Sequence, residues 1–68
     1  MILTKDKLML FILSRNPSWT ELKHEYPAEK GYSNVNQLMA ELIKEKSVTS
    51  GDGRHHVTEY GKKEYGFT

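Results

Sequence analysis

The chain of 68 residues has no cysteine, which excludes disulfide bonds and thiolate zinc sites as sources of stability. Its longest apolar run is LMLFIL at residues 8–13, which is far too short to cross a bilayer. The run is also short for a signal peptide, and no small-residue cleavage site follows it. We therefore expect a soluble protein of the reducing cytoplasm.

An excess of charge of either sign is also missing. Ten lysines and arginines face nine aspartates and glutamates, for a formal net charge of +1. Residues 1–34 carry five basic and four acidic side chains, and residues 35–68 carry five of each. This balance neither requires nor excludes a nucleic-acid partner, because only local clustering of basic side chains would indicate one.

Sequence patterns of known catalytic and metal sites are absent as well. The chain has no G-x-x-x-x-G-K-[ST] loop, no H-E-x-x-H motif, no cysteine nucleophile and no paired carboxylates in an apolar surround. His55 and His56 are adjacent, so on a strand they would point to opposite faces and not readily converge on one ion. We predict a protein that is not an enzyme and holds no cofactor or metal.

What the sequence does contain is a series of helix and turn signals. Asn16-Pro17 ends a first helix, because the residue before proline avoids helical dihedrals. Ser18 and Glu21 form a capping-box pattern for a second helix, and Asp52-Gly53 is a strong hairpin turn signal. The predicted elements are helices at residues 5–14, 18–26 and 33–46, a hairpin at 47–58 and a short helix at 59–65.

This order predicts an α+β domain. Three helices, the second and third joined by a tight connection, followed by a hairpin, are typical of a winged helix-turn-helix, with the hairpin as the wing and the third helix as the recognition helix. Large aromatic side chains are expected in the core of so small a domain. They are Phe11, Trp19, Tyr26 and Tyr60.

The stretch LMAELIKEKSVTSGDGRHHVTEYGKK, residues 38–63, resembles part of the MarR-like and PadR-like winged-helix regulators. In those families a leucine-rich helix leads through a basic exit to a charged wing with an arginine, and then to a hydrophobic-T-E-x-G segment. Here VTEYG at residues 57–61 occupies the last of these. The resemblance implies a DNA-binding fold, similar to that of small winged-helix proteins of phages, prophages and archaeal viruses.

Polar side chains at the start of the third helix are the clearest candidates for contact with DNA. Asn and Gln can bind adenine through two hydrogen bonds, and the first turn of a recognition helix meets base edges. Serine and asparagine are also favoured at helix starts, so Ser33 is expected to cap the helix, and Asn34 alone fits capping and DNA contact equally well. The candidates are Ser33, Asn34, Asn36 and Gln37.

The hairpin and the end of the third helix supply the other candidates. Arg54 follows the turn, where a wing meets the minor groove or a phosphate, although an exposed hairpin charge that discourages edge pairing is equally common. One of His55 and His56 is expected to pack against the protein while the other touches phosphate. Lys44 and Lys46 would also contact phosphates, but the glutamates among them fit a mixed solvated surface as well.

Together these features predict sequence-specific binding of double-stranded DNA by a transcriptional regulator. Residues 33–46 would enter the major groove, and residues 50–56 would lie on the backbone or minor groove. A single copy would bury little surface, so a homodimer or a protein partner is expected. The alternative is a protein-interaction module of the same fold that does not bind DNA and docks through the third helix or the aromatic C-terminus. Exposed Tyr65 and Phe67 are the candidate partner surface there, although a frayed tail is the more ordinary interpretation of these two residues.

Overall fold

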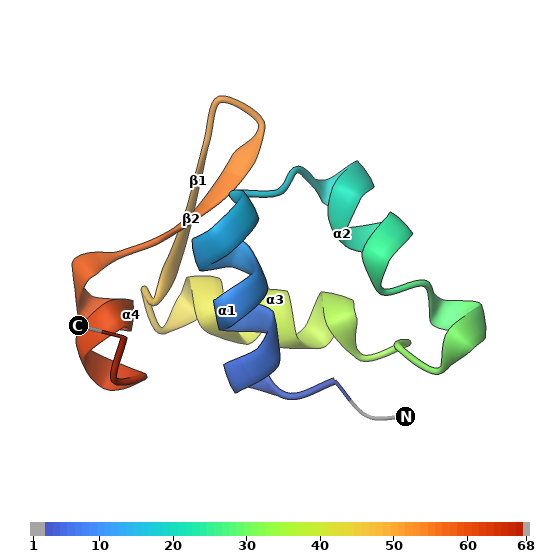
Figure 1. Ribbon diagram of the computed structural model, residues 1–68, viewed down its shortest axis with the longest axis horizontal. Helices are drawn as coiled ribbons and strands as arrows, with labels where there is room; N and C mark the ends of the chain where they lie inside the picture. The colour runs from blue at the N-terminus through green and yellow to red at the C-terminus, as the bar shows by residue number, and fades with distance from the viewer. Residues whose placement is uncertain (1–2, 68) are drawn as a thin grey trace.

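The computed structural model of the protein describes residues 3–67, which form four α-helices and one antiparallel two-stranded hairpin (Figure 1). The α+β class and the order of three helices, hairpin and last helix match the prediction. No helix within the described range is long and apolar enough to cross a membrane. In chain order the elements are α1 (Lys5–Arg15), α2 (Trp19–Glu25), the 3-10 turn η1 (Ala28–Lys30), α3 (Val35–Lys44), β1 (Val48–Gly51), β2 (Arg54–Val57) and α4 (Glu59–Glu64).

Short polar side chains set three of the four helix starts. Thr4, Ser18 and Thr58 each accept a hydrogen bond from the backbone N–H three residues further on, which satisfies one of the donors left open at a helix start. α1 ends at Asn16, which has a left-handed φ of 46° directly before Pro17. These boundaries follow from local signals in the sequence.

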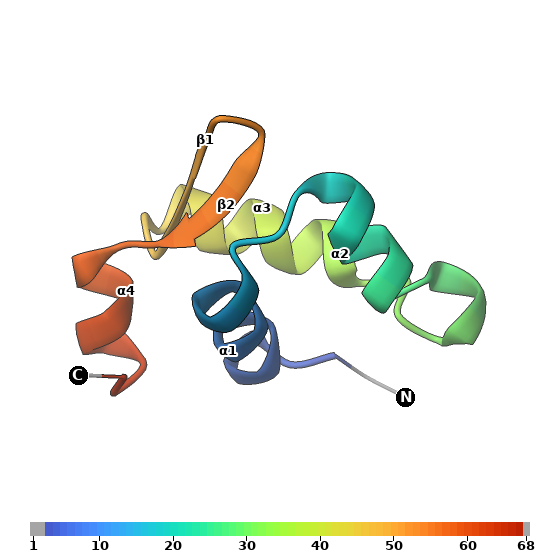
Figure 2. The ribbon, with the colours of Figure 1, turned by 45° about the horizontal axis from the view of Figure 1, so that its top comes forward.

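The core lies where α1 crosses α3, with α2 packed beside the crossing (Figures 1 and 2). α3 buries Val35, Met39 and Leu42, as its helical periodicity predicts, but Ile43 at the edge of that apolar face is 41% exposed. Among residues 3–67, the buried apolar side chains are Leu3, Leu8, Met9, Ile12, Leu22, Val35, Met39, Leu42 and Val48. Nine such residues make a thin core, so contacts outside it carry more weight than in a larger domain.

The aromatic side chains divide between the core edge and the surface. Phe11 and Tyr26 pack against the core and meet in an edge-to-face contact with their ring centroids 5.4 Å apart. Trp19 and Tyr60 are 39% and 52% exposed, so the prediction that they are core residues is wrong. Trp19 is exposed because it is the first residue of α2. Tyr60 lies on the outside of α4, where its hydroxyl donates a hydrogen bond to Glu64.

The hairpin is short and depends on the helices for support. Its register places Val48 opposite Val57, and Asp52-Gly53 closes it with φ angles of 54° and 75°, the positive pair of a type I′ turn. Two strands of this length are marginal by themselves in water. The free edge of β2 is held by the connection between α1 and α2, because His55 N–H donates to the Pro17 carbonyl at 2.9 Å.

Gly61 lets α4 lie close to the exit of α3. Thr58 N–H donates to the Ser47 carbonyl at 3.0 Å, which brings the start of α4 against that exit. A β-carbon at position 61 would overlap the Ser47 carbonyl oxygen and lie 3.0 Å from Met9 Cε. The sequence indicates only that this glycine weakens the last helix, whereas the structure gives it a packing role.

Gly61→Ala should therefore destabilise the protein although alanine is the better helix former. We expect the free energy of unfolding to fall by about 1–3 kcal/mol, the usual cost of forcing atoms into a packed site. Urea denaturation followed by circular dichroism measures it. Gly51→Ala is the control, since a β-carbon there meets no atom within 4 Å. Equal stabilities of the two variants would contradict the packing role.

Candidate nucleic-acid interface

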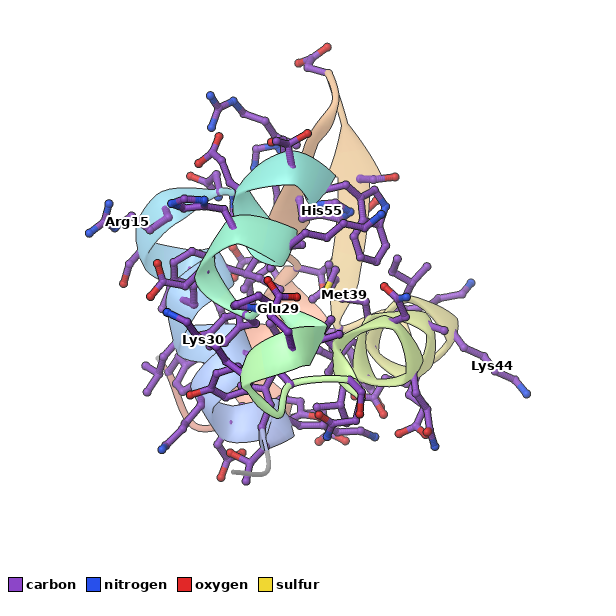
Figure 3. The ribbon with its side chains drawn as sticks, turned by 90° about the vertical axis from the view of Figure 1, so that its right-hand side faces the viewer. Arg15, Glu29, Lys30, Met39, Lys44 and His55 are labelled. Atoms are coloured by element: carbon purple, nitrogen blue, oxygen red, sulfur yellow. The ribbon has the colours of Figure 1, made fainter. Side chains whose placement is uncertain are left out.

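α3 presents a polar side to solvent, opposite its buried residues. Asn36, Ala40 and Lys44 are exposed and follow one another at intervals of four along that side, with Gln37 next to them. Figure 3 shows Lys44 pointing away from α1 and α2. The side chains offer an amide that donates and accepts, an ammonium group for anions, and a small residue between them that permits close approach of the backbone.

The two glutamates of α3 and its C-cap lie on the edge that faces α1. Lys5 Nζ is 3.2 Å from Glu41 Oε1 and 3.5 Å from Glu45 Oε2. Glu41 also accepts a hydrogen bond from Gln37 Nε2 at 3.2 Å, and this bond, followed by the one from Lys5, holds the pKa of Glu41 below its usual value. The row formed by Asn36, Ala40 and Lys44 therefore carries no carboxylate.

Neither of the two polar residues before α3 caps the helix with its side chain. Asn34 is the N-cap, but its side chain does not cap the helix and instead donates to the Leu3 carbonyl at 3.0 Å. Ser33 lies one residue before the cap, because Val35 N–H bonds to the Tyr32 carbonyl and α3 begins later than predicted. The prediction that Ser33 caps the helix is wrong, and the Asn34 amide ties the chain before α1 to α3.

A pocket of about 270 Å³ lies beside the start of α3, between α2, η1 and α3. Tyr26 and Tyr32 line it together with Lys23, Ser33 and Asn36. The pocket therefore brings a lysine of α2 next to the polar start of α3. Sequence analysis missed Lys23 because nothing in the local pattern tells which side of α2 faces α3.

Arg54 folds back from the hairpin onto the connection between α1 and α2. Its Nη1 donates to the Asn16 carbonyl at 3.0 Å and lies 3.4 Å from Glu21 Oε1. The residues at the tip itself are Asp52-Gly53. The side chain of Arg54 is exposed, but in the free protein it does not extend from the tip.

The two histidines of β2 lie on opposite faces of the strand. His55 is only 2% exposed, with Nδ1 2.9 Å from the Pro17 carbonyl oxygen and its ring edge-to-face with Trp19. Strand alternation turns His55 inward, so its side chain is not on the surface where the predicted DNA contact would need it. His56 is half-buried, so one histidine packs and the other is more accessible, as expected. Among residues 3–67, no three histidine, aspartate or glutamate side chains gather as a potential metal site.

The lysines after the middle of α3 remain accessible. Lys44 is in the last turn of the helix, and Lys46 follows it with a left-handed φ of 67°. Both side chains are exposed, and the Lys46 carbonyl accepts a hydrogen bond from the Thr58 hydroxyl at 2.6 Å. This bond fixes the direction in which the chain leaves α3 for the hairpin.

Tyr65 and Phe67, the candidate partner residues, pack against the core of their own chain. The Tyr65 hydroxyl donates to Glu45 Oε1 at 2.7 Å, and Ser47 Oγ donates to the same oxygen at 3.0 Å. Burial raises the pKa of the Tyr65 phenol, and the bond from Tyr65 is the main cause that lowers the pKa of Glu45. The prediction that these two rings are exposed is wrong, because the Glu45 carboxylate holds Tyr65 in place.

Comparison of the chain with protein-family models, with curated proteins and with solved structures finds no match. The family resemblance of residues 38–63 therefore stays a prediction.

The stabilities of His55→Ala and His56→Ala should distinguish a histidine that supports the fold from one that lies at the surface. His55→Ala removes a buried ring with its hydrogen bond and aromatic contact, so we expect the free energy of unfolding to fall by about 2 kcal/mol. The neighbouring His56→Ala should change it by less than about 0.5 kcal/mol. Chemical denaturation of the two variants measures both values. Losses of similar size would contradict the anchoring role of His55.

Proposed function

We propose that the protein is a winged helix-turn-helix that binds double-stranded DNA, with α3 as recognition helix and the hairpin as wing. The observation that carries the proposal is the outer row of α3, where Asn36, Ala40 and Lys44 stand exposed without a carboxylate among them. Lys5 holds the neighbouring glutamates on the edge toward α1. In the sequence, the glutamates close to the lysines were the main argument against a DNA-binding surface. In the structure Glu41 and Glu45 lie on the edge toward α1, so they weigh less against DNA binding by the row.

The dimensions and chemistry of α3 suit the major groove. An α-helix with its side chains is about 10–12 Å across, which matches the groove width of about 12 Å. Asn36 in the first turn can bind an adenine edge through two hydrogen bonds, and Ala40 leaves room for a thymine methyl group. Lys44 and Lys46 at one end of α3 and Lys23 near the other would contact backbone phosphates on the two sides of the groove.

We infer a regulatory rather than a catalytic role for this binding. The described part of the molecule measures 32 × 25 × 20 Å, so one copy would cover few base pairs. Two copies on a two-fold site would give the affinity and selectivity that a regulator needs. Tyr65 and Phe67 are half-buried against the core of their own chain, so each has only part of its ring available for a contact between copies.

Exposed apolar side chains favour the second candidate function, a protein-docking module. Trp19 and Ile43 are both large and substantially exposed. The two functions differ in their response to salt, because DNA binding releases counterions and weakens steeply as salt rises, whereas an apolar docking site does not.

Alanine substitutions on α3 test the DNA-binding function. With a labelled duplex and fluorescence anisotropy, Lys44→Ala should weaken binding to all sequences and reduce the salt slope by about one. Asn36→Ala should cost about 1–3 kcal/mol on the preferred sequence and relax the preference at one base pair. Lys30→Ala is the matched control, since Lys30 on η1 extends to a different side from Lys44 (Figure 3).

The control decides how the result is interpreted. We expect Lys30→Ala to leave the salt slope unchanged. Equal losses for Lys44→Ala and Lys30→Ala would show a general effect of charge and contradict a DNA-binding face on α3.

A further inference from the structure

The carboxylate of Glu21 is directed to the hairpin rather than to its own helix start. In a complete capping box it would accept a hydrogen bond from Ser18 N–H. Ser18 Oγ does accept from Glu21 N–H at 3.3 Å, but the Glu21 carboxylate lies 3.4 Å from Arg54 Nη1. No return bond to Ser18 N–H forms within residues 3–67, so only half of the predicted box exists.

The ion pair of Glu21 and Arg54 can break without disturbing the fold. The two side chains are 47% and 52% exposed, and water screens an exposed pair so well that it contributes little to folding. Arg54 Nη1 also donates to the Asn16 carbonyl, and the rest of the guanidinium makes no hydrogen bond to the described residues. Rotation of the Arg54 side chain alone would move the charge from α2 to the solvent beside the hairpin.

We propose that Glu21 is an intramolecular competitor for the DNA backbone: it holds Arg54 in the free protein, and a backbone phosphate replaces it on binding. The inference rests on the proposed DNA-binding function and names the group that limits its affinity. A phosphate diester can accept two parallel hydrogen bonds from the guanidinium fork, whereas Glu21 makes only an ion-pair contact of 3.4 Å with Nη1. Only the fraction of protein in which Arg54 is free of Glu21 can bind the phosphate through the guanidinium, so Glu21 lowers the apparent affinity.

Neutralising Glu21 while keeping its shape tests the proposal. Glu21→Gln preserves the size of the side chain, and Glu25→Gln removes the same charge one turn later on α2 as the control. Anisotropy with a labelled duplex at about 50 mM and about 200 mM salt gives the affinities. At the lower salt we expect Glu21→Gln to tighten binding by about twofold to fivefold more than Glu25→Gln, the range that an exposed ion pair allows. In an Arg54→Ala background this difference should vanish.

The outcomes separate this inference from the function on which it rests. Equal effects of Glu21→Gln and Glu25→Gln would overturn the competitor role while DNA binding stands. A difference that persists without Arg54 would overturn it too, because the competition would then not act through the guanidinium. Failure of the unaltered protein to bind the duplex at low salt would overturn both proposals.

A second measurement needs no variant. The Arg54 Nε–H signal in the NMR spectrum of the unaltered protein should shift when duplex is added, because its guanidinium changes partner. A signal that stays in place while the amides of α3 shift would show that Arg54 remains with Glu21, and would overturn the competitor role.

Discussion

The two hydrogen bonds from His55 to the Pro17 carbonyl are the interaction on which the arrangement of the hairpin depends. The backbone N–H and the ring Nδ1 of His55 both lie 2.9 Å from that oxygen. Asn16 strengthens the junction, since its Nδ2 is 3.5 Å from the His55 carbonyl. A hairpin of two four-residue strands has little stability alone, so this junction determines where it lies relative to the helices.

A second junction, centred on Glu45 at the C-terminal end of α3, connects α1, the exit of α3 and the end of α4. Its carboxylate joins Lys5 of α1, Ser47 at the exit of α3 and Tyr65 after α4. Because these contacts lower the pKa of Glu45, they stabilise the fold above the ordinary carboxyl pKa, and that stabilisation is lost as pH falls through the lowered value. The same contacts draw the carboxylate away from the outer side of α3, which links the stability of the fold to the charge of the proposed binding face.

Local signals in the sequence predicted much of the fold. Threonine and serine caps, the stop at Asn16-Pro17 and the turn at Asp52-Gly53 each act within a few residues, so they can be read from the chain. Helical periodicity also identified the buried side of α3 and thereby the exposure of Asn36 and Lys44. These are the parts of the candidate site that sequence analysis placed well.

The remaining parts depend on contacts between residues far apart in the chain. The inward position of His55 requires Pro17, and the engagement of Asn34 requires Leu3, 38 and 31 residues away. Arg54 is likewise engaged by Asn16 and Glu21. Neither periodicity nor spacing in the sequence predicts these contacts, because they form only when the hairpin and the helices pack together.

Backbone amide NMR of the labelled protein, titrated with a mixed-sequence duplex at about 50 mM and about 200 mM salt, tests the central claim most directly. We expect the largest shifts on Asn36, Ala40 and Lys44, and we expect them to fade at the higher salt. If those amides stay still at the lower salt, or if they shift equally at both, α3 is not a DNA-binding surface and the proposed function is wrong.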